Sequence, residues 1–200
     1  MRNIPEPIAV GEYPRLPIYR VPGFSTFAAY DIETTGLSPA CDSIIEIGAV
    51  KVVDGVISDN EQFIFSTLVH PYKNRIRPEI TRITGITNED VKNSPEMWDA
   101  FSAFADFIGE EILIGFNNTR FDDRFIERAG RYANRIITNK SFDVLTYSRK
   151  FKQLLGVDNL KLGTLSLKLG IENPHSHRAV FDALTTARVY LKLLELENLI

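Results

Sequence analysis

The chain has 200 residues, of which 44% are hydrophobic and 24% charged, and its formal net charge is −3. This composition is typical of a globular protein, and the length suits one domain of roughly 100–200 residues. No run of about 18 apolar residues is present, and the first 25 residues lack the apolar stretch of a secretory signal. The single cysteine, Cys41, excludes an intramolecular disulfide and a zinc site built from several thiolates. We therefore expect a cytoplasmic protein that does not contact a membrane.

Residues 1–24 are expected to form an extended arm, separate from a domain over residues 25–200. Five of the ten prolines fall within the first 22 residues, a density that blocks both helix and central strand. Apolar side chains at Tyr13, Ile18 and Tyr19 would let the arm lie against a surface. The sequence leaves open whether that surface belongs to the same domain, to a second copy of the chain or to a docking partner.

The predicted elements begin at Phe27, where the pattern becomes regular. Three strands come first, and helices with a 3.6-residue spacing of apolar side chains then alternate with short apolar strands. Strands are expected at Phe27–Glu33, Ser43–Asp54, Val56–Val69, Glu111–Phe116 and Lys140–Asp143, and helices from Ser94-Pro95 to Ile108, at Phe121–Tyr132, after Asp143 to Leu155, at Lys161–Leu169 and at Arg178–Leu196. This order predicts an α/β fold with a mixed central sheet, three antiparallel strands followed by parallel ones, flanked by helices on both faces.

Two carboxylates lie two residues apart at the end of the first predicted strand, at Asp31 and Glu33. Residues two apart in a strand point to the same face, with Cα atoms about 6.6–6.8 Å apart. Their repulsion raises the pKa of one of them unless a cation lies between. Taken alone, the pair also fits a solvated strand end. The Thr-Thr-Gly that follows permits a tight turn whose backbone can approach a ligand.

Two more carboxylates stand at predicted helix starts. Asp122 lies in the first turn of the helix after Glu111–Phe116, and Asp182 lies near the start of the last helix, five residues after His177. An acidic residue in a first turn also complements the helix N-terminus, and we assign that role to Asp123 on the outer side of its helix. The loop before Asp182 would let the imidazole of His177 fold back towards the carboxylate.

These side chains together suit metal-dependent phosphodiester cleavage. Carboxylates are hard oxygen ligands, which suit Mg²⁺ or Mn²⁺ rather than zinc. Two such ions about 3.5–4 Å apart stabilise the attacking and leaving oxygens of the reaction. A histidine can take a proton from the attacking water near neutral pH. Spacing alone does not show that the three segments meet.

Three segments resemble the motifs of the DEDDh 3′→5′ exonucleases, in particular the type of the proofreading epsilon subunit of bacterial DNA polymerase III. They are DIETTGL at 31–37, NNTRFDDRF at 117–125 and HRAVFDA at 177–183. Thr81–Thr87 also resembles the linker before that group's first helix, and Phe142–Leu145 its fourth strand. The resemblance covers about residues 25–196. It implies a ribonuclease H-like fold, two divalent cations (Mg²⁺ or Mn²⁺) and stepwise release of nucleoside 5′-monophosphates.

The resemblance also implies a role for each matching residue. His177 matches the general base, and Leu37 would wedge against the terminal base. Many members read H-N-A where this chain has Asn117-Asn118-Thr119, which leaves the contacts of the neighbours of Asn118 open. The implied metal ligands are Asp31, Glu33, Asp122 and Asp182, and the implied substrate-binding residues are Thr34, Gly36, Leu37, Asn118 and Phe121.

Several other polar residues compete for these roles. His175 lies on the same loop and would serve as the base if His177 points away. Asp143 is assigned to N-capping of a helix, His70 to a structural role and Cys41 to none. Contacts to phosphate are expected from basic residues near the cleft, with Arg120, Arg124, Lys161 and Arg178 as candidates.

The favoured function is a 3′→5′ exonuclease acting on the 3′ end of single-stranded or frayed DNA. A cleft that wedges Leu37 against one base needs that base to be unstacked. An RNA-directed exonuclease of the same family, similar to oligoribonuclease or ribonuclease T, is an alternative. A polymerase-associated adaptor with weak catalysis is another, although four clustered charges are costly to keep without a metal. A DNA polymerase subunit is thus a candidate partner.

Overall fold

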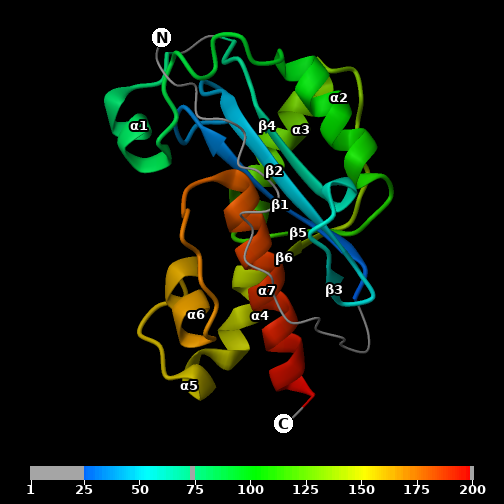
Figure 1. Cartoon of the computed structure of the whole chain (residues 1–200), viewed down its shortest axis with the longest axis vertical. Coiled ribbons are helices and arrows are strands. Elements are labelled where there is room, and N and C mark those ends of the chain that lie inside the picture. The colour runs from blue at the N-terminus through cyan, green and yellow to red at the C-terminus, as the bar shows by residue number, and fades with distance from the viewer. Residues whose placement is uncertain (1–24, 73–74, 199–200) are drawn as a thin grey trace.

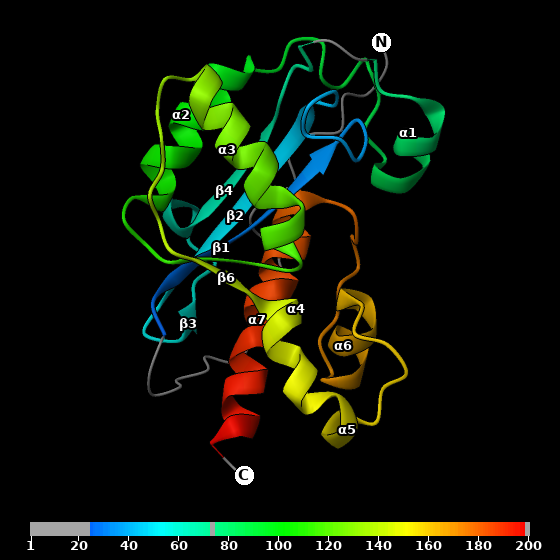
Figure 2. The ribbon, with the colours of Figure 1, turned by 180° about the vertical axis from the view of Figure 1, so that it is seen from behind.

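The structure is a computed structural model that describes residues 25–72 and 75–198. The predicted arm over residues 1–24 lies outside these residues, so it stays a prediction. Figures 1 and 2 show the described part from two opposite sides, as a twisted sheet with helices on both faces. Within residues 25–72 and 75–198, no helix combines the length and the apolar character needed to cross a membrane.

The central sheet has six strands in the order β3-β2-β1-β5-β6, with β4 beside β2. β1 pairs antiparallel with β2, and β2 pairs antiparallel with both β3 and β4. On its other side β1 pairs parallel with β5, which pairs parallel with β6. The predicted mixed sheet is therefore confirmed. The strands are β1 (Phe27–Thr34), β2 (Ile44–Val53), β3 (Val56–Ile57), β4 (Ile64–Leu68), β5 (Leu113–Gly115) and β6 (Ser141–Asp143).

Helices cover both faces of this sheet. In Figures 1 and 2, α2 and α3 lie on one face, and α7 lies on the other together with α4 and α6. The α-helices are α1 (Pro78–Thr84), α2 (Met97–Ile108), α3 (Asp122–Tyr132), α4 (Val144–Ser148), α5 (Lys152–Leu155), α6 (Leu162–Lys168) and α7 (Ala179–Glu197). Short 3₁₀ segments occur at Glu61–Phe63, Asn118–Arg120 and Arg149–Phe151.

β1 is buried on both faces, which explains its nearly continuous apolar sequence. Tyr30 packs towards α2, with its ring centroid 5.9 Å from that of Phe104. Phe27 packs towards α7, with its ring centroid 5.3 Å from that of Tyr190. Because side chains alternate along a strand, the odd-numbered residues of β1 share the α7 face. Asp31 therefore lies on the side from which α7 approaches.

Helix α1 differs from the prediction that Thr81–Thr87 forms a linker. Pro78 occupies the first turn of α1, where its fixed φ and its missing N–H are both compatible with a helix. Gly85 ends the helix in the left-handed conformation, with φ 74°. The proline is a start signal that the sequence reading missed.

Helix α2 begins at Met97, with Glu96 as its N-cap, rather than at Pro95. The hydroxyl of Ser94, at the predicted start of this helix, donates to the carbonyl of Asp90 at 3.4 Å. The single helix predicted from β6 to Leu155 is divided into α4, a 3₁₀ segment and α5. These differences lie away from the carboxylates at the end of β1.

Candidate active site

The last residues of β1 place two carboxylates on one face of the sheet. Asp31 is paired with Gly48 of β2, and Glu33 is paired with Glu46. Directly opposed residues of antiparallel strands share a face, so three carboxylates and one glycine form a patch there. The register shifts between Glu33 and Thr34, which marks a bulge of the kind that redirects side chains at strand ends.

Glu46 is a residue of this site that the sequence analysis missed. Its side chain is fully buried and accepts hydrogen bonds from Arg178, with Nη2 at 2.8 Å and Nε at 3.0 Å, and from the backbone N–H of Ala179 at 2.9 Å. Glu46 thereby fastens the start of α7 to β2. The guanidinium of Arg178 is engaged by this carboxylate through Nε and Nη2, and its predicted contact with phosphate stays a prediction. A lone acidic residue in the apolar run 44–50 was the available signal.

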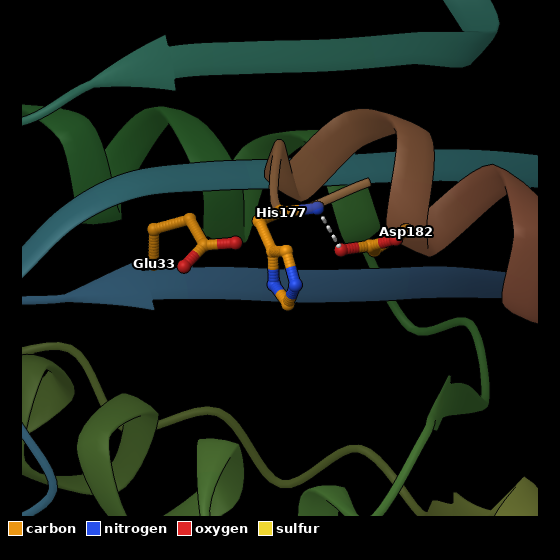
Figure 3. A group of neighbouring side chains, drawn as sticks. All are labelled: Glu33, His177 and Asp182. Carbon is orange, nitrogen blue, oxygen red and sulfur yellow. Dashed lines mark hydrogen bonds between the residues drawn. The ribbon is translucent and has the colours of Figure 1, made fainter. Parts of the chain in front are cut away.

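Gly48 allows the first turn of α7 to lie directly against β2. A Cβ at position 48 would overlap the backbone of Ala179 and Val180, so a larger residue there would push the helix away. The close approach brings Asp182 to the face that carries the carboxylates of β1. Figure 3 shows the side chains of Glu33, His177 and Asp182 together, and their candidate ligand atoms lie within 4.8 Å of one another.

The carboxylate of Asp182 is held by two hydrogen bonds. The backbone N–H of His177 donates to Oδ2 at 2.8 Å, and Nδ2 of Asn173 donates to Oδ1 at 2.7 Å. His177 has a left-handed backbone (φ 64°), and its imidazole lies between the two carboxylates drawn in Figure 3. His175 instead packs against Phe181, with ring centroids 4.6 Å apart. The structure thus places His177, rather than His175, at the carboxylates.

Asp122 reaches the same site from the opposite face of the sheet, at the start of α3. The backbone of Ile32 in β1 helps to lower the pKa of the Asp122 carboxyl group. The charge of Asp122 in turn raises the pKa of Asp31, so the two carboxylates lie within electrostatic range of each other. Phe121, just before α3, is half-buried with its ring centroid 5.1 Å from that of Phe125. A contact of Phe121 with substrate stays a prediction.

Asp123 does not lie on the outer side of its helix as predicted. It accepts hydrogen bonds from the hydroxyl of the buried Tyr30, from Nδ2 of Asn118 at 3.2 Å and from the hydroxyl of Ser141 at 2.8 Å. Asn118 is 0% exposed, so the prediction that it lines a substrate cleft is wrong. These side chains form a network that fixes the start of α3, and with it Asp122.

The turn after β1 presents Leu37 to solvent. The hydroxyl of Thr34 donates to the carbonyl of Gly36 at 2.6 Å, and the carboxylate of Asp42 accepts from the backbone N–H of Ser38 at 2.9 Å. A Cβ on Gly36 would lie 2.6 Å from that carboxylate, so a larger residue there would displace the side chain of Asp42. Leu37 is 83% exposed at the head of the turn. Its predicted contact with a terminal base stays a prediction.

The remaining predictions concern residues outside the acidic cluster. Asp143 caps α4, accepting from the backbone N–H of Leu145 at 2.9 Å, which confirms its predicted role. Nδ1 of His70 lies 3.0 Å from the carbonyl oxygen of Val91, in keeping with a structural role. Cys41 is exposed on the loop between β1 and β2.

Burial raises the pKa of all four carboxylates, and the charges of neighbouring carboxylates add to this effect. Burial raises the pKa of Glu33 to about 8, and the charges of Glu46, Asp182 and Asp122 add to this effect. Burial likewise raises the pKa of Asp122 to about 7, although two backbone hydrogen bonds oppose it. The pKa values of Asp31 and Asp182 are raised for the same first cause. A cluster of oxygen donors that repel one another fits divalent cations such as Mg²⁺ or Mn²⁺.

The stability of the metal-free protein is expected to fall as the pH rises from about 5 to about 8. The folded-state pKa of Glu33 is raised from 4.5 to about 8 and that of Asp122 from 3.8 to about 7, so the folded state binds protons more tightly than the unfolded state. Stability from these groups is fully present below their ordinary pKa values and is lost as the pH rises through the raised ones.

A divalent cation would offset this repulsion, so the stabilisation by Mn²⁺ should grow with pH. Melting temperatures in EDTA and in MnCl₂ across this pH range measure the difference, with NaCl at matched ionic strength as the control. If the difference between the melting temperatures in MnCl₂ and in EDTA did not change with pH, the raised pKa values would be contradicted.

A mixed sheet whose central strand ends in carboxylates, joined by further carboxylates from the first turns of two helices on opposite faces, defines a ribonuclease H-like nuclease. Residues 28–190 match a family model described as Exonuclease. The chain belongs to this exonuclease family, and exonucleases of this type use divalent metals. The expected fold and enzyme class are thereby confirmed.

Several proteins similar to this chain are DNA polymerases III of the PolC type. The chain is 38% identical over 169 residues to that of Caldanaerobacter subterraneus subsp. tengcongensis, and 34% identical over 176 residues to that of Bacillus subtilis. These matches cover 84% and 85% of this chain but only 12% and 11% of the relatives. The chain thus matches a small segment of each polymerase.

Solved structures of E. coli exonuclease I share the fold. The zinc-bound complex with single-stranded DNA has a TM-score of 0.74 and is 22% identical, and the complex with a dT13 oligonucleotide has a TM-score of 0.71 and is 21% identical. Each match covers 86% of this chain and 41% of the other. At this identity the likeness supports the fold alone.

Proposed function

We propose that this domain is a 3′→5′ exonuclease that removes nucleoside 5′-monophosphates from the 3′ end of single-stranded or frayed DNA. One observation carries the proposal, the meeting of Asp31, Glu33, Asp122 and Asp182 beside the imidazole of His177. The four carboxylates would hold two divalent cations, Mg²⁺ or Mn²⁺. When bound, such ions stabilise the charge on the attacking and leaving oxygens.

The side chains of this domain would orient the reactants and move one proton. His177 would take a proton from water as the water oxygen bonds to the terminal phosphorus. The bond between that phosphorus and the 3′ oxygen of the preceding nucleotide then breaks, and this oxygen takes a proton from solvent. The products are a nucleoside 5′-monophosphate and a strand one nucleotide shorter, which regains a 3′ hydroxyl. Asn173 and the backbone of His177 would keep the Asp182 carboxylate in place.

DNA is the favoured substrate because the relatives that share 33–38% identity are named as DNA polymerases. A polymerase segment or subunit is by the same reasoning a candidate partner. Leu37, exposed at the head of the turn after β1, would wedge against the terminal base and select unpaired ends. RNA contains the same phosphodiester, so the two polymers need a direct comparison.

The test is degradation of 5′-labelled single-stranded DNA and RNA oligonucleotides with Mg²⁺, with Mn²⁺ and with EDTA. We expect a ladder that shortens from the 3′ end, faster on DNA than on RNA, and no products in EDTA. Faster cleavage of RNA would favour the exoribonuclease alternative. No cleavage of either polymer by the folded protein would contradict the proposal and favour an adaptor.

His177→Asn is expected to slow hydrolysis by about 10²-fold or more, the usual contribution of a general base. Asparagine tolerates the left-handed backbone of position 177 and keeps the N–H that Asp182 accepts, so the fold should be preserved. His175→Asn is the matched control on the same loop and should retain the wild-type rate. Rates on one labelled DNA strand and melting temperatures measure both effects. An equal loss in the two variants would contradict the assignment of the base to His177.

A further inference from the structure

An aromatic pocket of about 350 Å³ lies beside the loop that carries Leu37. Its walls come from the end of that loop, from the segment after β4, from the start of α2 and from α3. Lining residues on the first two segments include Cys41, Asp42, His70 and Tyr72, and those on the two helices include Trp98, Phe125, Arg128 and Tyr132. None of the residues proposed to bind metal, act as the base or contact the terminal nucleotide lines this pocket.

Three aromatic rings stand open to solvent on this pocket. Tyr72 is 65% exposed, Trp98 is 50% exposed and Tyr132 is 57% exposed. Across residues 25–72 and 75–198 these are all of the exposed large aromatic side chains, and they gather in one place. The rings of Tyr72 and Tyr132 lie 6.2 Å apart between centroids. Exposed rings grouped in this way mark a binding surface rather than ordinary surface composition.

Arg128 holds two walls of the pocket together. Its guanidinium donates to the backbone carbonyls of Pro39 and Asp42, and so ties the loop after β1 to α3. The same guanidinium lies 5.4 Å from the ring centroid of Tyr132. Asp42 and Glu96 are also in the lining, so the pocket as a whole is not a simple anion site. Rings beside an arginine are the features that stack the bases of a single strand.

A second hollow of about 330 Å³ is lined by Thr35, Asp42, Arg75 and Arg77. Asp42 lines both hollows, so the two are neighbours. Thr35 follows Glu33 by two residues, which places the second hollow next to the end of β1. Its two guanidinium groups suit the phosphates of a strand, although Arg77 also pairs with Glu79 at 3.3 Å.

We propose that the nucleotides upstream of the 3′-terminal two pass over the loop after β1 and stack their bases on Tyr72, Trp98 and Tyr132. The strand would place its terminal two nucleotides at the carboxylates, the phosphate upstream of them near Arg75 and Arg77, and the next bases in the aromatic pocket. This inference rests on the proposed exonuclease function and adds a site for the upstream strand. The proposal predicts that a strand long enough to reach the pocket binds more tightly than a dinucleotide.

The chain's only tryptophan, Trp98, reports occupancy of this pocket without any need for catalysis. In EDTA, which stops hydrolysis, a dodecamer of thymidylate should quench the fluorescence of Trp98, because a stacked base contacts the indole. Thymidylyl dinucleotide should not, because it fills only the region of the carboxylates. Equal quenching by both ligands, or by neither, would overturn the proposal.

Substitution of two rings tests the same site through activity. Tyr72→Ala with Tyr132→Ala should lower the ratio of kcat/KM on the dodecamer to kcat/KM on the dinucleotide by at least about five-fold, the lower end for loss of one stacked base. Tyr72→Phe with Tyr132→Phe keeps the rings and should keep the ratio. Leu167→Ala on α6 removes an exposed apolar side chain outside the pocket and serves as the control.

The two proposals fail in different ways. Quenching by the dodecamer without hydrolysis of either substrate would overturn the exonuclease function and support the pocket as a strand-binding site. Hydrolysis of both substrates with an unchanged ratio in the alanine variant, and no quenching, would overturn the pocket and leave the exonuclease intact. That result would favour a protein partner as the occupant of the rings.

Discussion

Asp31→Asn is expected to lower the rate of hydrolysis by about 10³-fold or more, because the loss of one metal ligand removes several kcal/mol of transition-state stabilisation. The same change should raise the melting temperature of the metal-free protein. The pKa of Asp31 is raised by burial and then by the charges of Asp122, Asp182, Glu33 and Glu46, so an amide of nearly the same size relieves repulsion. A gain of about 1 kcal/mol corresponds to a rise of about 2–4 °C in a domain of this length.

Asp31→Asn should lower activity but raise the melting temperature, so the two measurements distinguish a catalytic role from a role in folding. Rates with Mn²⁺ and melting temperatures in EDTA would be measured for Asp31→Asn and for Asp59→Asn, an exposed carboxylate on the segment after β3. The Asp59 variant should match the wild type in both measurements. Parallel loss of activity and stability in the Asp31 variant would show that this carboxylate supports the fold instead. Retained activity would remove it from the catalytic set.

The sheet and the last helix could be predicted because their signals are local and long. β1 opens with an apolar run from Phe27 to Tyr30, and α7 spans 19 residues, enough for its apolar spacing to repeat over several turns. Its observed bounds differ by one residue at each end from the predicted Arg178–Leu196. Helix α1 spans only 7 residues, too few for a periodic pattern to stand out, and only Pro78 indicated its start.

The carboxylates were predictable for the same reason. Asp31 and Glu33 share a strand face by simple alternation, and Asp122 and Asp182 each mark a helix start. None of these signals requires knowledge of distant parts of the chain. The resemblance to a known motif set then related the three segments to one another.

The supporting residues could not be predicted because each depends on long-range register. Glu46 lies opposite Glu33 only in the observed pairing of β1 with β2, and it meets Ala179 only because Gly48 admits the helix. The spacing of apolar residues in α3 orients Asp123 relative to its own helix. It does not reveal that Ser141 of β6 lies beside that carboxylate.

Glu46 has two opposed effects on the site. Its charge helps to raise the pKa of Glu33, whereas the Arg178 guanidinium that it holds lowers that pKa. Glu46 also accepts from the first amide of α7, so the position of Asp182 depends on this ion pair. The pair is therefore expected to act on stability more strongly than an ion pair at the surface.

Arg178→Met is expected to destabilise the protein by about 3 kcal/mol, towards the lower end for breaking a buried pair because the arginine retains some contact with solvent. The side chain of Glu46 is 1% exposed and that of Arg178 is 29% exposed, so removal of the guanidinium leaves a buried charge without its partner. With about 2–4 °C per kcal/mol, the melting temperature should fall by about 6–12 °C. Arg131→Met, which breaks an exposed pair with Glu127 on α3, should change it little.

A double-mutant cycle shows whether the loss comes from the uncompensated carboxylate or from missing packing. In Glu46→Gln with Arg178→Met the buried charge is gone, and the glutamine oxygen still accepts from the N–H of Ala179. Most of the lost stability should therefore return, with a coupling of about 1–3 kcal/mol between the two positions. Thermal unfolding of the four proteins at one pH in EDTA measures this coupling. Additive losses would mean that the arginine acts through its packing alone and does not serve to neutralise Glu46.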